Sequence, residues 1–309
     1  MQFDFACGKV GAVIKMKKQL KGSLSIILAT VIWGSTFVAQ SVGVTKIGPF
    51  SFLAIRSALA VVALLFVILI RTRKQFLSTI LNPKLWLAGI PCGIALFVAT
   101  ALQQWGLVYT TPAKGGFITA MYIILVPIFG LFLKRKPPVT VGIGAILAVF
   151  GLYLLSGGMD TVNIGDVLTL GCAIAFAIQI LIVDRVAGDL DSMALNMAQA
   201  LVCSVASFIA VLFTETLVMA DILSCWLPLC YAGVLSMGVA YTLQIVGQKA
   251  LEPTTASLLM SFESIFAALS GWLVLNQTLS TTEFLGCALV FVAIILSQIP
   301  IKNRKKAPV

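Results

Sequence analysis

The chain has 309 residues, of which 60% are hydrophobic, only 10% are charged and none is histidine. A soluble domain carries about 25% charged residues, which cover its surface in water. The composition therefore excludes a soluble fold and predicts an integral membrane protein. The lack of histidine excludes histidine general bases, Ser-His-Asp triads and histidine metal sites. The seven cysteines include no Cys-x-x-Cys pair, so we expect neither a zinc site nor a disulfide framework.

Apolar stretches of about 20 residues, the length that crosses a bilayer as a helix, recur along the chain. Backbone groups in lipid must find hydrogen-bond partners within their own segment, so these stretches predict helices rather than strands. The predicted helices span residues 22–41, 49–70, 85–106, 112–133, 139–156, 165–184, 193–214, 226–248, 254–275 and 283–300. Turn residues separate them, at Gly48-Pro49, Asn82-Pro83, Pro137-Pro138, Gly157-Gly158 and Glu252-Pro253. The predicted fold is an all-α membrane protein with ten transmembrane helices, and residues 1–15 are expected to be unstructured.

The net charge of +10 fits two interpretations, a nucleic-acid partner or a membrane topology signal. The positions of the charges favour topology. With a cytoplasmic N-terminus and ten helices, all of the 21 Lys and Arg except Lys46, Arg56 and Lys114 fall in cytoplasmic segments. This orientation satisfies the positive-inside rule, and the reverse orientation violates it. We therefore expect a multi-pass protein of the plasma (inner) membrane with both termini in the cytoplasm and no nucleic-acid partner.

An internal repeat divides the chain into two halves of five predicted helices each. The matches, at an offset of 143 residues near the start and 141 later, pair Gly22 with Gly165, Arg56 with Gln199, Gln103 with Gln244, Gly106 with Gly247, and Pro112 with Pro253. Because five is odd, the second half enters the membrane from the opposite side, which predicts two inverted repeats. The predicted units are a cytoplasmic tail over 1–21, repeats over 22–157 and 165–300, and a basic tail over 301–309. Inverted repeats are typical of secondary transporters, which bind substrate near the midplane between them.

Two charged residues fall inside predicted spans and are candidates for function. Glu263 lies about 14 Å deep in its helix, where a lone carboxylate is costly unless it is protonated, paired or facing a wet cavity. It either binds a cationic group or carries a coupling proton, or else it stays protonated and bonds a neighbouring helix for structure. Arg56 either snorkels outward, attracts an anionic group of the substrate, or pairs with Glu263.

Neutral polar residues complete the candidate binding site. Spacings of three and four residues place several of them on single helix faces, including Gln103 with Thr100 and Gln244 with Tyr241. We expect Trp33, Arg56, Gln103, Tyr122, Gln244 and Glu263 to line a midplane cavity. The alternative for the neutral residues is hydrogen bonding between helices, worth under about 1–2 kcal/mol per bond.

The chain resembles the drug/metabolite transporter superfamily in its ten-helix EamA-like branch. The residues that carry the likeness are Trp33-Gly34-Ser35-Thr36-Phe37, Arg56, the stretch from Tyr109 to Thr119 (YTTPAKGGFIT), Val126-Pro127, and the helix after Glu252-Pro253. The resemblance implies two inverted five-helix repeats, cytoplasmic termini, a central cavity between helices 1–4 and 6–9, and peripheral fifth and tenth helices. One departure concerns the ninth helix, where the family often has Gly-Glu and this chain has Glu263-Ser264 and then Asn276-Gln277.

These observations predict a secondary transporter that moves a small metabolite, an amino acid or a related amphipathic solute, by alternating access. Export is favoured by the resemblance alone. No phosphate-binding loop of the G-x-x-x-x-G-K-[ST] kind occurs, so nucleotide-driven pumping and a cofactor are not expected. The expected partners are the solute, membrane lipids and a coupling proton. Two rival functions are a lipid-modifying membrane enzyme, which the absence of clustered acids disfavours, and a non-transporting sensor or scaffold.

Overall fold

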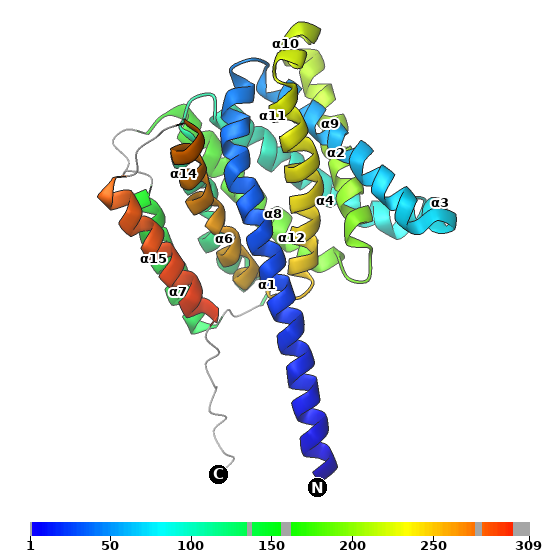
Figure 1. The fold of residues 1–309 in the computed structure, drawn as a ribbon, viewed down its shortest axis with the longest axis vertical. Coiled ribbons are helices and arrows are strands. Elements are labelled where there is room, and N and C mark those ends of the chain that lie inside the picture. The colour runs from blue at the N-terminus through cyan, green and yellow to red at the C-terminus, as the bar shows by residue number, and fades with distance from the viewer. Residues whose placement is uncertain (1, 135–137, 156–161, 276–279, 299–309) are drawn as a thin grey trace.

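The computed structural model describes residues 2–134, 138–155, 162–275 and 280–298, and it contains helices and no strand within these ranges. The predicted turn at Gly157-Gly158, the departure at Asn276-Gln277 and the predicted basic tail over 301–309 lie outside them. The helices pack side by side into one bundle (Figure 1). The all-helical fold predicted from the apolar runs is therefore correct.

The first half of the chain contributes the helices up to residue 155. They are α1 (Gln2–Val44), α2 (Pro49–Thr72), the 3-10 helix η1 (Arg73–Gln75), α3 (Phe76–Ile80), α4 (Pro83–Gly106), α5 (Pro112–Thr119), α6 (Tyr122–Phe132) and α7 (Val139–Leu155). Proline opens α2, α4 and α5, where its missing N–H would have no partner in any case. The side chains of Asn82 and Thr111 accept backbone N–H groups at the starts of α4 and α5.

The second half contributes the remaining helices. They are α8 (Ile164–Val186), α9 (Ser192–Thr214), α10 (Met219–Ser224), α11 (Trp226–Cys230), the π-helix η2 (Tyr231–Ala240), α12 (Tyr241–Gln248), α13 (Pro253–Met260), α14 (Phe262–Leu275) and α15 (Thr281–Gln298). A capping box of Asn163 and Asp166 fixes the start of α8, and Asp191 caps α9. The predicted helix over 226–248 is continuous but changes from α to π and back.

Two sequence expectations about helix limits are wrong. Residues 2–15 belong to α1, whose first turns extend beyond the other helices (Figure 1). No proline occurs before Pro49, so nothing in that stretch forces the helix to start later. The predicted helices over 112–133 and 254–275 are each broken in two, after Thr119 and after Met260.

Eight helical segments in the described part of the chain are long and apolar enough to cross a membrane: Met16–Val44, Pro49–Ile80, Pro83–Gly106, Lys114–Phe132, Ile164–Val186, Ser192–Thr214, Trp226–Gln248 and Pro253–Val274. Two further apolar helices, Val139–Leu154 and Thr281–Leu296, are shorter. These two belong to α7 and α15, which pack against each other at one side of the bundle (Figure 1). At 1.5 Å per residue each is about 25 Å long, a few ångströms less than a typical hydrocarbon core.

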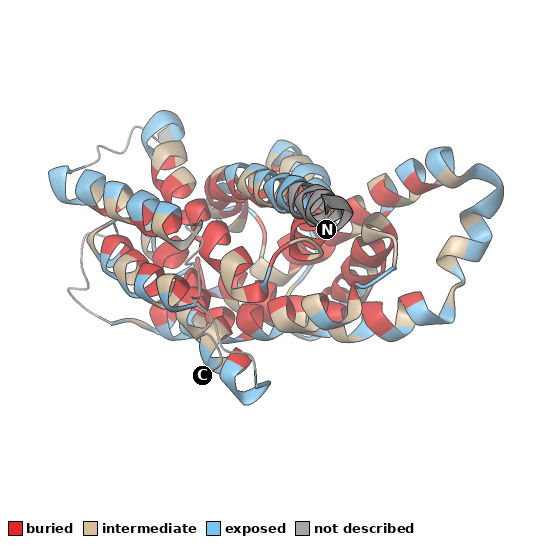
Figure 2. Ribbon diagram, turned by 90° about the horizontal axis from the view of Figure 1, so that it is seen from below, coloured by how far each residue is buried: buried red, intermediate tan, exposed pale blue. Residues whose placement is uncertain are grey.

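The distribution of side chains is that of a protein in lipid. Large apolar side chains cover the periphery, with Leu87, Phe132 and Phe213 at least 80% exposed. Polar side chains, among them Gln104 and Gln199, are fully buried in the interior. Buried residues accordingly gather along the inward faces of the helices (Figure 2). Because lipid offers no hydrogen bonds, such polar groups must find partners inside the bundle.

Chain connections define two ends of the bundle. The Lys249 end holds the end of α8, the start of α9 and the end of α12, with Asp184, Asp191 and Lys249. The Asp166 end holds the end of α1 and the starts of α5 and α8, with Lys114 and Asp166. The beginning of α1 projects from the Lys249 end (Figure 1).

Candidate functional site

A cavity lies in the interior of the bundle. Its lining is Trp33, Thr36, Phe37, Gln40, Arg56, Gln103, Tyr122, Phe176, Ile180, Ser236, Tyr241, Gln244, Met260 and Glu263. Every one of these residues is at most 9% exposed, so the lining belongs to the buried interior of the bundle. The lining includes all six residues that the sequence predicts to share a midplane site, although their role in binding remains a prediction.

Arg56 reaches this cavity from α2 and is 3% exposed. Its Nη1 donates a hydrogen bond of 2.7 Å to Oε1 of Gln40, and its guanidinium carbon lies 5.8 Å from the ring centre of Phe52. Its Nε has no hydrogen-bond partner among the described residues. The structure also shows no ion pair between Arg56 and Glu263 within that part of the chain. The cation is thus buried without a carboxylate, a costly arrangement that favours an anionic ligand.

Glu263 pairs with a neutral residue instead. The Tyr122 hydroxyl donates a hydrogen bond of 2.8 Å to Oε1 of Glu263, and both side chains are buried. Because Glu263 both lines the cavity and bonds another helix, the geometry is compatible with either role that the sequence allows for it.

The Tyr122–Glu263 hydrogen bond lies where two broken helices meet. Tyr122 is the first residue of α6, after the break that follows α5, and Glu263 is the second residue of α14, after the break at Ser261. The two positions are separated by 141 residues, the offset of the internal repeat. Short helices in corresponding places of two halves are a feature of transporter binding sites. No proline or glycine lies at either break, so neither break is predicted from the residues there.

The remaining walls combine aromatic rings with amides. Trp33 and Tyr241 pack edge to face with ring centres 5.0 Å apart, and Nε1 of Trp33 lacks a partner among the described residues. Nε2 of Gln244 donates to Oε1 of Gln179 at 3.1 Å, which leaves Oε1 of Gln244 without a donor there. The cavity therefore offers two unused donors, on Trp33 and Arg56, and one unused acceptor, on Gln244.

Several lining residues were not predicted, but the repeat contains the signal for them. Phe176 and Ile180 follow Trp33 and Phe37 by the offset of 143 residues that relates the starts of the two halves. With the pair Gln103 and Gln244, the repeat thus supplies equivalent residues to opposite walls. At the offset of 141 residues, Ser236 and Met260 correspond to Ala95 and Thr119, which do not line the cavity.

Other polar residues that share helix faces serve to join helices. Nδ2 of Asn196 donates to the carbonyls of Met237 and Gly238 in the π-helix η2, at 2.9 and 2.8 Å. Nε2 of Gln199 donates to Oδ1 of Asn196 at 2.9 Å. Neither Asn196 nor Gln199 lines the cavity. Their bonds tie α9 to η2, as the interhelical alternative predicts.

Comparison with known proteins identifies the family. The sequence matches the EamA-like transporter family twice, over residues 20–157 and over residues 163–298. The chain belongs to the EamA-like transporter family. It is therefore a multi-pass membrane transporter, as the resemblance predicted, and family membership agrees with the expectation of a protein that is not an enzyme.

Similar proteins within this family carry names that give no substrate. An uncharacterized transporter of Archaeoglobus fulgidus is 28% identical over 90% of this chain and 86% of its own length. The uncharacterized transporter YoaV of Bacillus subtilis is 22% identical over 93% of this chain and 99% of its own length. A solved crystal structure, 20% identical, superimposes with a TM-score of 0.75 over 90% of this chain and 96% of its own. That likeness shows the fold alone.

Proposed function

We propose that this EamA-like transporter exports a small zwitterionic metabolite, an amino acid or a related solute, by alternating access through the central cavity. The observation that carries the proposal is the set of buried polar atoms without partners that belong to residues lining this cavity. Trp33 and Arg56 offer donors, while Gln244 offers an acceptor in a lining that also includes Glu263. A carboxylate of the solute would bind the first pair, and its ammonium group would bind the second.

Helix packing supports two inverted repeats as the basis of alternating access. Gly22 of α1 lies so close to α12 that an added Cβ would be 3.2 Å from the carbonyl oxygen of Gly247. Gly165 of α8 approaches α4 in the same way, with 2.7 Å from an added Cβ to the carbonyl oxygen of Gly106. Each glycine of one contact is the repeat equivalent of a glycine in the other. The Tyr122–Glu263 bond joins two further equivalent positions, as expected near a two-fold axis between the halves.

The distribution of lysines and arginines between the two ends supports an orientation with the Lys249 end in the cytoplasm. Of the described lysines and arginines outside the cavity, only Lys46 and Lys114 belong to the Asp166 end; the Lys249 end holds the rest. The positive-inside rule places such an end in the cytoplasm of the cell. The proposed membrane is the plasma (inner) membrane, with both termini cytoplasmic. The export direction rests on the family resemblance.

The test is a flux assay with purified protein in liposomes, against a panel of amino acids and related solutes, with and without a pH gradient. We expect rapid flux of at least one zwitterionic solute. Absence of flux for the whole panel, or turnover of lipid by the same preparation, would overturn the proposal in favour of a scaffold or a lipid-modifying enzyme.

Two variants separate binding from folding in that assay. Arg56→Lys keeps the charge but loses the planar donor set, so we expect at least a tenfold loss of affinity. Glu263→Gln keeps the bond to Tyr122 but cannot exchange a proton, so a coupling role predicts loss of the pH dependence. Matched controls are Arg185→Lys, at an exposed residue, and Glu283→Gln, at a partly exposed one; neither residue lines the cavity. Unchanged flux and pH dependence in Glu263→Gln would assign that residue to structure.

A further inference from the structure

A second hollow, which we call the Lys249 cleft, opens at the Lys249 end between α1, α8 and α12. Its lining includes Lys18, Asp184, Gly188, Gln248, Lys249 and Glu252. The four charged side chains among these are two cations and two anions. The cleft therefore has no net charge that would exclude a zwitterion or select a plain anion or cation over it.

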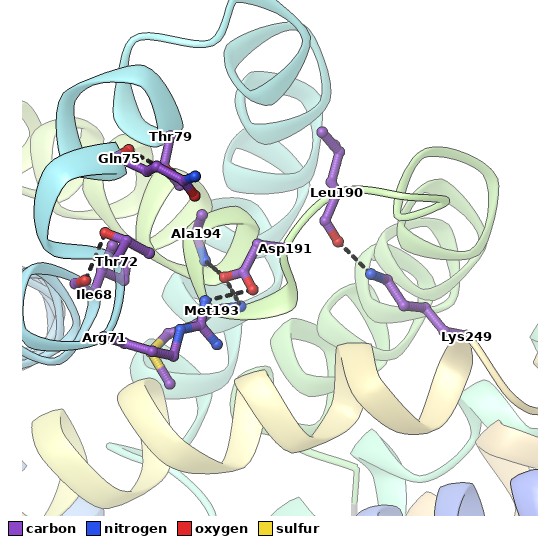
Figure 3. Close-up of polar contacts among 10 residues, drawn as sticks. All are labelled: Ile68, Arg71, Thr72, Gln75, Thr79, Leu190, Asp191, Met193, Ala194 and Lys249. Carbon is purple, nitrogen blue, oxygen red and sulfur yellow. Dashed lines mark hydrogen bonds and ion pairs between the residues drawn. The ribbon is translucent and has the colours of Figure 1, made fainter.

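The loop after α8 forms one wall of the cleft, and hydrogen bonds hold this loop from two sides. Nζ of Lys249 donates to the backbone carbonyl of Leu190 (Figure 3). The next residue, Asp191, accepts a hydrogen bond of 2.5 Å from Nη2 of Arg71 and also caps α9 (Figure 3). Partial burial lowers the pKa of Lys249, while the nearby Asp191 and Asp189 act in the opposite direction. The loop is thereby connected to α2 and α12, and the cleft is a formed feature of the fold.

Only one turn of α12 separates this cleft from the central cavity. Gln248 lines the cleft, and Gln244, four residues earlier on the same face, lines the cavity. The rise between them is about 6 Å. Nε2 of Gln248 donates a hydrogen bond of 2.9 Å to the carbonyl of Ile180, another residue that lines the cavity. Both Gln248 and Ile180 are at most 3% exposed, so this buried contact joins a residue of one hollow to a residue of the other.

Both glutamines hold an unused acceptor. Oε1 of Gln248 and Oε1 of Gln244 are buried and lack a donor among the described residues. An ammonium group that leaves the cleft for the cavity would meet first one amide oxygen and then the other, before it reaches Glu263. Such a series of acceptors offsets the cost of removing the ammonium group from water at each step.

We propose that the Lys249 cleft is the passage by which the solute reaches the central cavity, and that Gln248 is the gate between them. Rotation of the Gln248 amide away from the Ile180 carbonyl opens the passage and presents its oxygen to the ammonium group. The inference rests on the proposed function for the identity of the solute, but the passage and its gate are testable without any solute.

The test uses a reporter cysteine on each side of the gate in the full-length protein. Ser236→Cys places a thiol in the wall of the central cavity, and Gln19→Cys places one in the cleft. The probe is a membrane-impermeant quaternary-ammonium thiol reagent, applied to inside-out vesicles and to spheroplasts. Peptide mass spectrometry distinguishes each reporter from the native cysteines. We expect Gln19→Cys to react quickly in inside-out vesicles and slowly in spheroplasts.

The gate is tested by a second substitution in the Ser236→Cys protein. Gln248→Ala removes the hydrogen bond to Ile180, so we expect labelling of Cys at position 236 from the cytoplasmic side to rise about two- to tenfold. Gln248→Leu, which keeps most of the volume, is the variant to use if the alanine protein does not fold. Gln104→Ala is the matched control, because Gln104 is an equally buried glutamine that lines neither hollow.

Three results would overturn the inference. They are equal labelling of position 236 with and without the Gln248 substitution, an equal increase in the Gln104→Ala control, and labelling of Gln19→Cys from the spheroplast side only. A protein that shows the expected labelling but no flux in liposomes would retain the gate and lose the proposed function, so the two failures are distinguishable.

Discussion

The two ends of the bundle are closed by equivalent positions with different chemistry. At the Lys249 end, the polar Gln248 holds the backbone carbonyl of Ile180. At the Asp166 end, the repeat places Leu107 and Phe37 at these positions, and both pack with Ala267 in a small apolar cluster. Equivalent positions of the two halves therefore make a polar contact at one end of the bundle and an apolar contact at the other.

A second difference reinforces the first. At the Asp166 end, Nζ of Lys114 lies 2.8 Å from Oδ2 of Asp166, and the Thr110 hydroxyl donates to Oδ1 at 3.2 Å. The repeat equivalent of Asp166 is the neutral Ser23 at the Lys249 end. The ion pair at the Asp166 end is thus largely buried and accompanied by apolar packing, whereas the Arg71–Asp191 pair at the Lys249 end is exposed and one hydrogen bond, from Gln248 to Ile180, lies between the cleft and the cavity. This inequality favours opening toward the Lys249 end, which suits a protein that loads its solute from the cytoplasm.

The largest effect is expected from removal of the acidic group at the Asp166 end. Asp166 is 4% exposed and accepts hydrogen bonds from Lys114, Thr110 and the backbone of Asn163. Asp166→Ala should lower the free energy of unfolding by about 2–3 kcal/mol, through the lost ion pair and the lost helix cap. Thermal unfolding in detergent measures the change. The control is Ser23→Ala, expected to change stability by under about 0.5 kcal/mol. Equal losses of unfolding free energy in Asp166→Ala and Ser23→Ala would show that these equivalent positions stabilise the two ends equally.

The glycine contacts, which both ends share, come next. A Cβ at position 165 would lie 2.7 Å from the Gly106 carbonyl oxygen and 2.8 Å from Cβ of Tyr109, so α8 must move away from α4. At position 22 the nearest atoms are Cβ of Ala250 at 2.7 Å and a carbonyl oxygen at 3.2 Å. Gly165→Ala and Gly22→Ala should each cost about 1–3 kcal/mol by overpacking, with the larger loss at Gly165. Thermal unfolding again measures the loss of stability. A loss in only one of the two variants would contradict equivalent glycine packing at the two ends.

The same glycines show how far the sequence alone leads. Runs of apolar residues predict the helices and most of their limits, because the length of a bilayer crossing is fixed by physics. The repeat matches at Gly22 and Gly106 fall at close helix contacts, which the matches themselves did not predict. Spacing on helix faces also brings Arg56, Gln103 and Gln244 to one cavity, since buried polar groups in a membrane protein have few other places to lie.

Other features depend on contacts that one sequence does not reveal. The pairing of Glu263 with Tyr122 rather than with Arg56 depends on which faces of α6 and α14 meet. The breaks after Thr119 and Met260 carry no proline or glycine, and two carbonyls of the π-helix η2 accept hydrogen bonds from the side chain of Asn196 in α9. The number of spans also stays open to test, because α7 and α15 are slightly short for a bilayer.

The third prediction exchanges the chemistry of the two closures. Leu107→Gln places an amide in the apolar cluster with Phe37 and Ala267, where an unsatisfied polar group costs about 1–2 kcal/mol. We expect the thiol reagent to reach Ser236→Cys faster from the Asp166 side, measured in spheroplasts. Leu107→Met, which keeps the apolar contact, is the control. Access that stays confined to the Lys249 side would show that the ion pair alone closes the Asp166 end.

The smallest effect is expected at the rim of the Lys249 cleft. The Arg71–Asp191 pair is short, at 2.5 Å, but its side chains are 48% and 34% exposed, so water and salt screen it. Arg71→Gln should change the free energy of unfolding by under about 1 kcal/mol, and less still at high salt. Asp191→Ala also removes the cap on Met193 and Ala194, and should cost about 1 kcal/mol more than Arg71→Gln. Thermal unfolding of both variants at low and high salt separates the contributions. A salt-independent loss of unfolding free energy in Arg71→Gln, as large as that in Asp166→Ala, would show that ion pairs stabilise the two ends equally. The preference for opening at the Lys249 end would then have to rest on Gln248 and Leu107 alone.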